Sequence, residues 1–153
     1  MKKSIILTLC VALLIFAACT NNKKSDSGTS DSTKLDNRQC YLAVSKTDSA
    51  TDSATLSIGK ENSKTVGRLA FNFSKKDDTN GSISGEFSGD TLFVEYAFEY
   101  KGTKYSNPQV FLMKGDSLIQ GHGDMRTMLG RTYFEDHSKI MFDGFVFKPT
   151  DCK

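Results

Sequence analysis

The chain has 153 residues, a length that fits one domain. Its 20 basic and 18 acidic residues nearly balance, and removing Lys2 and Lys3 of the N-terminus leaves 18 of each sign. A polyanion-binding protein carries a clear basic excess, so this composition argues against nucleic acid as a partner.

Residues 1–18 have the pattern of an export signal. Two lysines precede an apolar run over residues 5–18 that only Thr8 interrupts. This run of about fourteen residues suits a signal peptide, whereas a membrane-spanning helix needs about twenty. Small residues then lead directly into Cys19. The junction resembles the lipobox of bacterial lipoproteins, in which the cysteine thiol receives diacylglycerol before the signal is cleaved.

We therefore expect cleavage after Ala18 and lipidation of Cys19. Polar sequence begins immediately after Cys19, which favours this interpretation over an ordinary secretory peptide or a buried N-terminal helix. Several acyl chains, at about 0.8 kcal/mol per buried CH₂, make a durable anchor. The mature protein is thus predicted to be held to a membrane by lipid without spanning it.

Residues 19–38 are predicted to form a disordered tether. After Cys19 they are almost all small, polar or charged, with Leu35 as the single aliphatic residue. Such a segment cannot bury enough apolar surface to order itself. As a flexible chain it has a root-mean-square reach of roughly 22–26 Å.

Residues 39–153 are predicted to form an all-β domain. Apolar residues recur with a period of two over residues 69–73, 83–87, 92–100 and 145–147. Glu95 and Glu99 fall on the opposite face of the third segment, which is typical of an antiparallel sheet with one wet face.

Turn motifs separate these segments and predict eight or nine short strands in meander order. The motifs include Gly89-Asp90, Lys101-Gly102 and Gly115-Asp116. The pattern fits a small closed barrel or a sandwich, and a barrel leaves no exposed strand edges. Met125, Met128 and Leu129 have helical spacing, which predicts one or two helical turns before Gly130.

The four cysteines are predicted to have separate fates. Cys10 is discarded with the signal, and Cys19 takes the lipid. Cys40 and Cys152 stand at the two ends of the β-patterned region, in an exported protein where disulfides persist. A bridge between them is favoured over free or metal-bound thiols, because no ligand pair lies beside either one. The β-domain is thus expected to be closed by a terminal disulfide.

Two motifs invite a catalytic or metal interpretation. Gly115-Asp116-Ser117-Leu118 matches the short signature of the GDSL esterases, in which the serine is the nucleophile. Too few residues follow Ser117 for that architecture, and Gly89-Asp90 repeats the same pattern, so both are interpreted as tight turns. Asp77 and Asp78 lack the anchoring carboxylates of a calcium loop and are interpreted as part of a hydrophilic turn. We predict no catalytic residue, no metal site and no cofactor.

Tyr96, Tyr100 and Tyr105 are a candidate ligand-binding set. They cluster around a predicted turn, and tyrosines are frequent on surfaces that contact sugars or proteins. The alternative is core packing from alternating strand positions.

From Cys40 to Cys152 the chain resembles a family of small exported lipoproteins of Bacteroidota that has no assigned activity. The resemblance rests on Cys40-Tyr41-Leu42, Gly85-x-Phe87-x-Gly89-Asp90-Thr91-Leu92, Lys114-Gly115-Asp116-x-Leu118-Ile119-Gln120-Gly121 and Asp151-Cys152. It implies a lipoprotein of the outer membrane. Surface-exposed lipoproteins of this group often carry an acidic run after the lipidated cysteine. Its absence here favours the periplasmic side.

Together these features predict a non-enzymatic, membrane-anchored module that binds a protein or glycan of the envelope. Two alternatives stay open. One is a lysozyme-inhibitor-like barrel, which is similar in size, lipidation and disulfide use but has an aromatic motif that is not evident here. The other is a serine hydrolase that uses Ser117.

Overall fold

The computed structural model of the protein describes residues 36–152. The predicted signal peptide, Cys19 and most of the predicted tether lie outside these residues. The strands are β1 (Asp36–Thr47), β2 (Ala50–Glu61), β3 (Lys64–Asn72), β4 (Thr79–Ser88), β5 (Thr91–Tyr100), β6 (Thr103–Lys114), β7 (Ser117–Gly121), β8 (Met125–Met128), β9 (Arg131–Phe134) and β10 (Val146–Thr150). A 3₁₀ helix, η1 (His137–Lys139), lies between β9 and β10. Nowhere in this part of the chain is there a helix long and apolar enough to cross a membrane.

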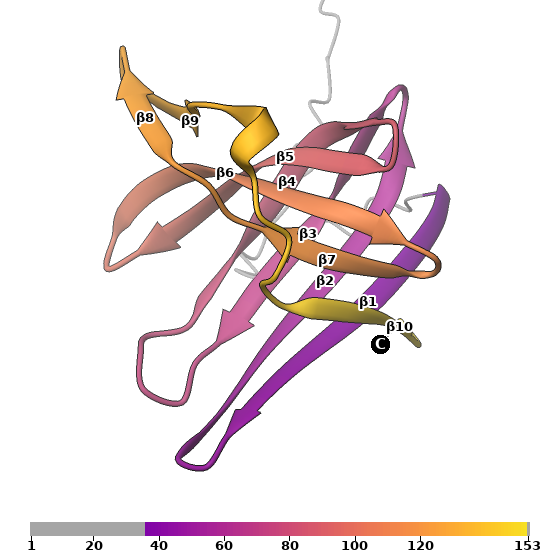
Figure 1. The fold of residues 1–153 in the computed structure, drawn as a ribbon, viewed down its shortest axis with the longest axis vertical. Helices are drawn as coiled ribbons and strands as arrows, with labels where there is room; N and C mark the ends of the chain where they lie inside the picture. Colours follow the sequence, from indigo (N-terminus) through magenta and orange to yellow (C-terminus); the bar gives the residue numbers. More distant parts are fainter. Residues whose placement is uncertain (1–35, 153) are drawn as a thin grey trace, which may run out of the picture. The chain divides into compact units, whose positions relative to one another are not determined.

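Eight of the strands close into an antiparallel barrel, which confirms the predicted meander (Figure 1). Strands β1 to β7 pair in sequence order, and β10 lies between β7 and β1. Strand β1 begins within the segment expected to be a tether, because pairing of Asp36 with Lys60 needs only backbone groups. The closed barrel, rather than the sandwich, is the observed fold.

The barrel interior is filled by the alternating apolar residues. The largest fully buried side chains are Phe111, Phe147, Leu56, Leu69, Ile83, Leu92, Leu118 and Val110. Phe111 and Phe147 meet edge to face with ring centroids 5.5 Å apart. Each such side chain contributes about 1.5–3 kcal/mol through removal from water. The hydrophobic pattern is therefore the main source of the fold's stability.

Tight turns at one end of the barrel follow the predicted Gly-Asp motifs. Gly89 and Gly115 have φ values of 59° and 65°, a left-handed conformation that glycine adopts without steric cost. The amide of Met113 donates a 2.8 Å hydrogen bond to the carbonyl of Asp90, so the two turns lie side by side. This end of the barrel also carries the Cys40–Cys152 disulfide.

Gly85 has a structural role that the alternating pattern did not reveal. It falls at an inward position of β4, and a Cβ placed there would lie 1.9 Å from the carbonyl oxygen of Phe93. Strand β4 therefore approaches β5 too closely for any side chain at this point. A glycine inside a strand often marks such a bend in a barrel wall.

The helix predicted around Met125 is wrong. Strands β8 and β9 form a separate hairpin that projects from the barrel between β7 and η1 (Figure 1). Leu129 and Gly130, with φ values of 52° and 76°, make the two-residue turn. Positive φ at both central residues is typical of a type I′ hairpin turn. The Thr127 and Thr132 hydroxyls lie 2.9 Å apart across the hairpin, a cross-strand contact that helical spacing could not predict.

Candidate functional site

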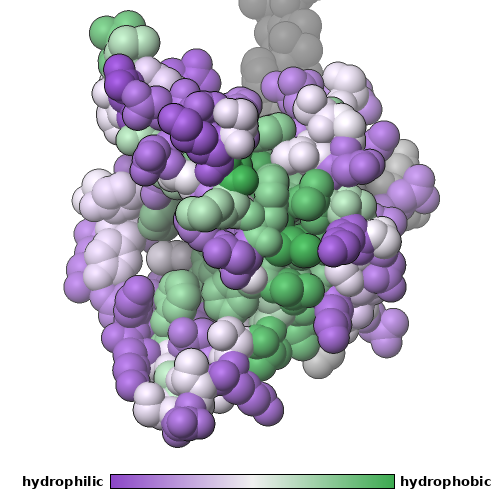
Figure 2. Space-filling model, in the orientation of Figure 1, coloured by the Kyte–Doolittle hydropathy of each residue, from purple (hydrophilic) through white to green (hydrophobic). Residues whose placement is uncertain are grey.

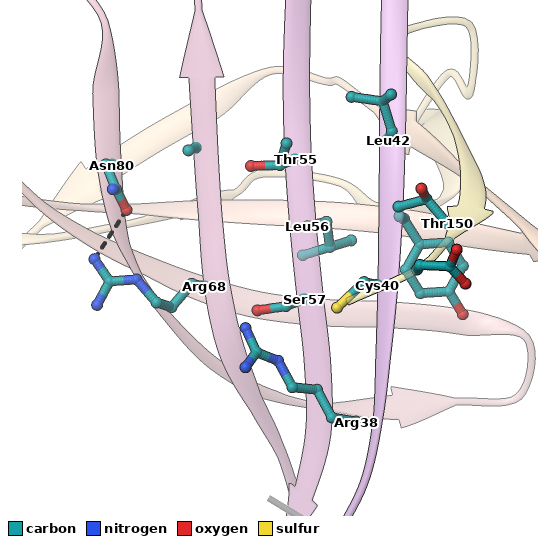
Figure 3. Close-up of a pocket in the computed structure, with 12 residues that line it drawn as sticks. Arg38, Cys40, Leu42, Thr55, Leu56, Ser57, Arg68, Asn80 and Thr150 are labelled. Atoms are coloured by element: carbon teal, nitrogen blue, oxygen red, sulfur yellow. Dashed lines mark hydrogen bonds between the residues drawn. The ribbon is translucent and has the colours of Figure 1, made fainter. Parts of the chain in front are cut away.

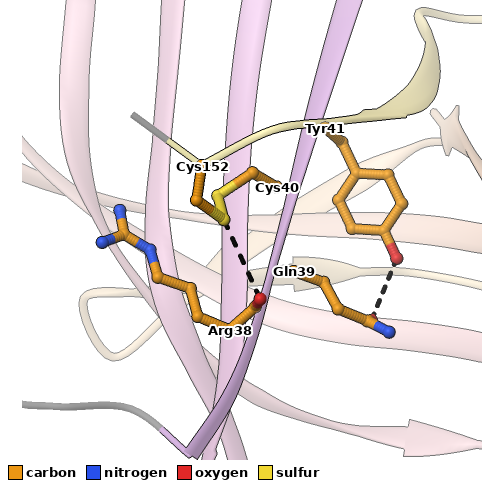
Figure 4. Close-up of a disulfide and its surroundings, with 5 residues drawn as sticks. All are labelled: Arg38, Gln39, Cys40, Tyr41 and Cys152. Carbon is orange, nitrogen blue, oxygen red and sulfur yellow. Dashed lines mark hydrogen bonds between the residues drawn. A yellow bond between two sulfur atoms is a disulfide. The ribbon is translucent and has the colours of Figure 1, made fainter.

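Cys40 and Cys152 form a disulfide, which confirms the predicted pairing (Figure 4). Their Cα atoms are 5.2 Å apart. Cys40 pairs with Thr150 across β1 and β10, so the bond fixes the strand pair that closes the barrel. The Cys152 sulfur also lies 3.8 Å from the carbonyl oxygen of Arg38, at the start of β1.

Beside the disulfide, the outer wall of the barrel carries a groove of about 340 Å³ (Figure 3). The alternation that buries Tyr41, Leu56 and Leu69 turns their neighbours outward into this groove. Two cross-strand rows form its floor. One row runs Thr150, Cys40, Ser57 and Arg68, and the next runs Leu42, Thr55, Ala70 and Asn80.

The charged groups that line the groove are two guanidinium groups, of Arg38 and Arg68, and the carboxylate of Asp151. The Arg38 side chain extends from β1 across β2, toward the strand that carries Arg68 (Figure 3). Arg68 Nη2 donates a 3.0 Å hydrogen bond to Asn80 Oδ1, which orients its side chain. Within residues 36–152 neither guanidinium forms an ion pair with a carboxylate. Several donors of each group therefore stay available to a ligand.

These residue types suit an anionic ligand that also carries hydroxyl groups. A guanidinium presents planar donors that match a carboxylate or a phosphate. Thr55 and Ser57 lie on β2, between the strands that carry the two arginines. Their hydroxyls are able both to donate and to accept hydrogen bonds. Sequence reasoning missed Arg38, Arg68 and Asn80, because they come from three strands whose register brings them together.

The three tyrosines of the candidate binding set do not form one surface. Tyr96 is only 3% exposed and lies in the core, as the core-packing alternative expects. Its ring stacks on Phe98, which stacks in turn on the 44% exposed Tyr105. The Tyr100 hydroxyl donates to the Asp77 carboxylate. Tyr96, Phe98 and Tyr105 share the inward face of β5 and β6, because Phe98 pairs directly with Tyr105. Tyr96 lies deeper in the barrel, and Tyr105 lies nearer the β5–β6 turn, where the side chains become exposed.

The hydroxyl of Tyr96 is an unusual feature of the core. This hydroxyl is buried and has no hydrogen-bond partner among the residues that the structure describes. The nearby Thr79 hydroxyl on β4 partly offsets the effect of burial on the pKa of Tyr96. Burial raises the pKa of the Tyr96 phenol above 10.0, since the charged form would lose its hydration. The phenol is therefore neutral at physiological pH.

The carboxylates of the acidic loop between β3 and β4 form hydrogen bonds within the chain that stabilise the loop. Asp77 accepts from the Tyr100 hydroxyl and lies 3.2 Å from the Lys101 ammonium. These hydrogen bonds lower the pKa of Asp77 below 3.8. Asp78 Oδ1 accepts a 2.9 Å hydrogen bond from the Phe73 amide. Over residues 36–152 no three metal-binding side chains come together.

Ser117 is the first residue of β7, directly after the β6–β7 turn, and its hydroxyl donates a 3.0 Å hydrogen bond to Asp116. His122 is at the other end of the five-residue β7, roughly 16 Å away along an extended strand. Its Nδ1 lies 3.0 Å from an Asp143 oxygen, while His137 stacks on Phe93. Neither histidine is therefore a hydrogen-bonded base for Ser117, and this favours the turn interpretation.

A second groove, of about 280 Å³, separates the β8–β9 hairpin from the barrel wall. Its lining is largely aromatic and includes Phe93, Tyr133, Phe134 and His137. The carboxylate of Glu95, also in this lining, already accepts a 2.6 Å hydrogen bond from Ser106. The other Glu95 oxygen lies 3.7 Å from Arg131, so this groove offers stacking surfaces and one carboxylate that already has two partners.

Outward-facing aliphatic residues form an apolar row across four strands of the barrel. The row consists of Val44, Val146, Ile119 and Leu112. Hydrophobic side chains gather at the centre of the face that Figure 2 shows. The row carries no charged group that would select one kind of partner, so it adds less to a functional assignment than the arginine groove.

Comparison of the chain with protein-family models, with curated proteins and with solved structures finds no significant match.

Proposed function

We propose that the chain is a non-enzymatic, lipid-anchored binding module of the bacterial outer envelope, and that its arginine groove binds an acidic glycan. The observation that carries the proposal is the pair Arg38 and Arg68, two guanidinium groups that flank hydroxyl-bearing side chains in one groove. The anchor is Cys19, at the end of the export signal. The periplasmic side of the outer membrane is the proposed location.

An acidic sugar supplies the chemistry that this groove complements. Its carboxylate fits a guanidinium fork, and its ring hydroxyls match Thr55, Ser57 and the amide of Asn80. A volume of about 340 Å³ lies within the usual range for small-ligand sites. Both arginines are exposed, so water and salt screen their charges and the binding should weaken as salt rises.

The glycan assignment is tested by calorimetric titration of the mature chain with trigalacturonate at low salt. Cys19→Ser removes the lipid and keeps the protein in solution. We expect Arg38→Gln/Arg68→Gln to weaken binding by about tenfold or more, since a hydrogen bond to a charged group contributes about 1.5–3 kcal/mol. Lys46→Gln, which removes an exposed cation from the same strand as Arg38, is the matched control. Equal binding by the double variant and the control would exclude the groove as the site.

The anchor is tested separately by metabolic labelling with palmitate. Wild-type protein should incorporate the label and show an intact mass that fits cleavage before Cys19. Cys19→Ser should incorporate none, because the thiol that receives the lipid is missing. Unchanged labelling of Cys19→Ser would show that the anchor is elsewhere.

A further inference from the structure

The end of the β8–β9 hairpin exposes apolar side chains to water. At the tip, Leu129 is 95% exposed and Met128 is 59% exposed. Met125, at the base of the hairpin opposite Phe134, is 47% exposed. In Figure 2 the tip of this hairpin, at the upper left, is coloured as hydrophobic and has hydrophilic side chains behind it. The base of the hairpin is fixed, because Phe134 is buried and the Glu135 amide donates to the Asp124 carbonyl.

Leu129 occupies a position where the backbone favours other residues. Its φ of 52° is left-handed, a conformation in which glycine and asparagine are common and leucine is not. Asparagine would suit both this turn and the surrounding water better. The leucine therefore contributes nothing to the fold that a polar residue would not, which points to a role in contact with something apolar.

The residues behind the tip are arranged in a definite order. Met128 pairs with Arg131, and Arg126 pairs with Tyr133 two residues further back. Alternation along a strand puts these four side chains on one face of the hairpin. Arg131 lies 3.7 Å from Glu95 and Arg126 pairs with Glu135, but all four of these charged side chains are largely exposed. The tip is thus apolar at its end, and two exposed ion pairs of balanced charge lie behind it.

We propose that this hairpin tip inserts into the interface of an anionic lipid bilayer, the membrane to which Cys19 anchors the chain. Leu129 and Met128 enter the acyl boundary, and the flexible stems of Arg126 and Arg131 let their charges reach lipid phosphates. Tyr133 lies at the level of the headgroups, where tyrosine is enriched in membrane proteins. The proposal rests on the anchored location given under the proposed function.

A bilayer fits this tip better than a protein partner does. A stable protein interface buries about 800 Å² on each side, usually on a broad surface. A two-residue turn with two exposed apolar side chains, Leu129 and the flanking Met128, offers much less, whereas a fluid interface accepts a narrow protrusion. Both arginines are exposed within their ion pairs, so they can exchange a carboxylate partner for an anionic headgroup. A second, weak membrane contact would also orient a domain that a flexible tether leaves free to rotate.

The test measures co-sedimentation of the unlipidated mature chain, Cys19→Ser, with vesicles of phosphatidylcholine and phosphatidylglycerol. We expect binding that increases with phosphatidylglycerol and falls with salt. Leu129→Asn should weaken it by roughly tenfold or more, a factor that burial of one leucine side chain would supply. Arg131→Gln should reduce binding to anionic vesicles without changing binding to neutral ones. Val44→Thr, at an exposed apolar residue on the barrel wall, should bind like the parent.

Misfolding cannot imitate the expected result, because Leu129→Asn fits the turn and should melt at the parent temperature or above. Absence of vesicle binding by the parent, or equal binding by Leu129→Asn, would overturn the insertion proposal. Arg38→Gln/Arg68→Gln should keep vesicle binding while losing trigalacturonate, and Leu129→Asn should do the reverse. Failure of the tip and failure of the groove are thereby told apart, and palmitate labelling reports on the anchor independently.

Discussion

Two turns of this protein share one backbone conformation and carry different side chains. In the barrel, Lys101 and Gly102 join β5 to β6 with φ values of 49° and 77°. In the hairpin, Leu129 and Gly130 join β8 to β9 with φ values of 52° and 76°. The barrel turn uses a charged residue that pairs with Asp77, whereas the hairpin turn uses an aliphatic residue that contacts water. Because the backbone requirement is the same, the difference lies in what each side chain contacts: Asp77 of the β3–β4 loop for Lys101, and water for Leu129.

The barrel and the hairpin also differ in how they are stabilised. Each barrel strand has two neighbours and one face in the core, so its stability depends on long-range packing. The hairpin has a single pair of strands, and isolated two-stranded hairpins are marginally stable in water. Substitutions in the barrel should therefore change the free energy of unfolding, and substitutions at the hairpin tip should change only binding.

The largest expected effect comes from opening the barrel at its closing strand pair. Cys40→Ser/Cys152→Ser removes a bond between residues 112 positions apart. We expect the free energy of unfolding to fall by about 4–5 kcal/mol, since the unfolded chain gains the freedom that the loop had restricted. Urea denaturation at neutral pH measures the change. A loss below about 1 kcal/mol would show that β1 and β10 hold together without the covalent link.

The next effect contrasts two phenylalanines of the barrel. Phe111→Ala leaves a cavity in the fully buried core and should cost about 3–5 kcal/mol. Phe87→Ala, at a 38% exposed position on β4, is the matched control and should cost about 1 kcal/mol or less. Urea denaturation of both variants gives the comparison. Equal losses would contradict the assignment of the core.

The hairpin tip should show almost no effect on folding. Leu129→Asn is expected to change the free energy of unfolding by less than about 0.5 kcal/mol, and toward stabilisation, because asparagine accepts left-handed φ. Thermal melting followed by circular dichroism detects the direction. A clear loss of stability would mean that Leu129 packs within the fold, and it would end the contrast between the two turns.

The smallest effect is a dependence on acid at the β3–β4 loop. Hydrogen bonds from Tyr100 and Lys101 lower the pKa of Asp77 below 3.8. A carboxylate with a lowered pKa stabilises the fold above its unfolded pKa, and this contribution is lost as pH falls through the folded value. Asp77→Asn should therefore melt slightly below the wild type at pH 7, and the difference should shrink as pH falls below 3.8. A difference that persists in acid would contradict the ionic origin.

Local patterns predicted the parts of this fold that depend on neighbours along the chain. The period of two over residues 69–73 and 92–100 identified inward-facing residues, and the Gly-Asp motifs identified two turns. The spacing of Met125, Met128 and Leu129 was misread as helical. A pair of four-residue strands is too short to show a clear alternation. In the sequence, Gly130 is the only residue that indicates the turn between them.

The candidate site could not be predicted in the same way. Arg38, Arg68 and Asn80 are separated by long stretches of chain and have no shared motif. They meet because β1, β2, β3 and β4 pair in one register. A shift of one strand by one residue would turn its outward side chains to the inner face of the barrel. The tyrosines, which are close in sequence and share the inward face of β5 and β6, differ in exposure because Tyr96 lies deeper in the barrel than Tyr105.

The sequence by itself determined the strand pattern, the turns and the pairing of Cys40 with Cys152, and it predicts the lipid address at Cys19. The strands and turns depend on residues that are neighbours along the chain. The disulfide follows because Cys40 and Cys152 are the two cysteines that remain after Cys10 and Cys19 are assigned. Only the tertiary structure decided that the sheet closes as a barrel, that two arginines share a groove, and that Leu129 stands at the tip of a projecting hairpin. Those outcomes depend on register and on closure of β10 between β7 and β1, which arise from many distant contacts acting together.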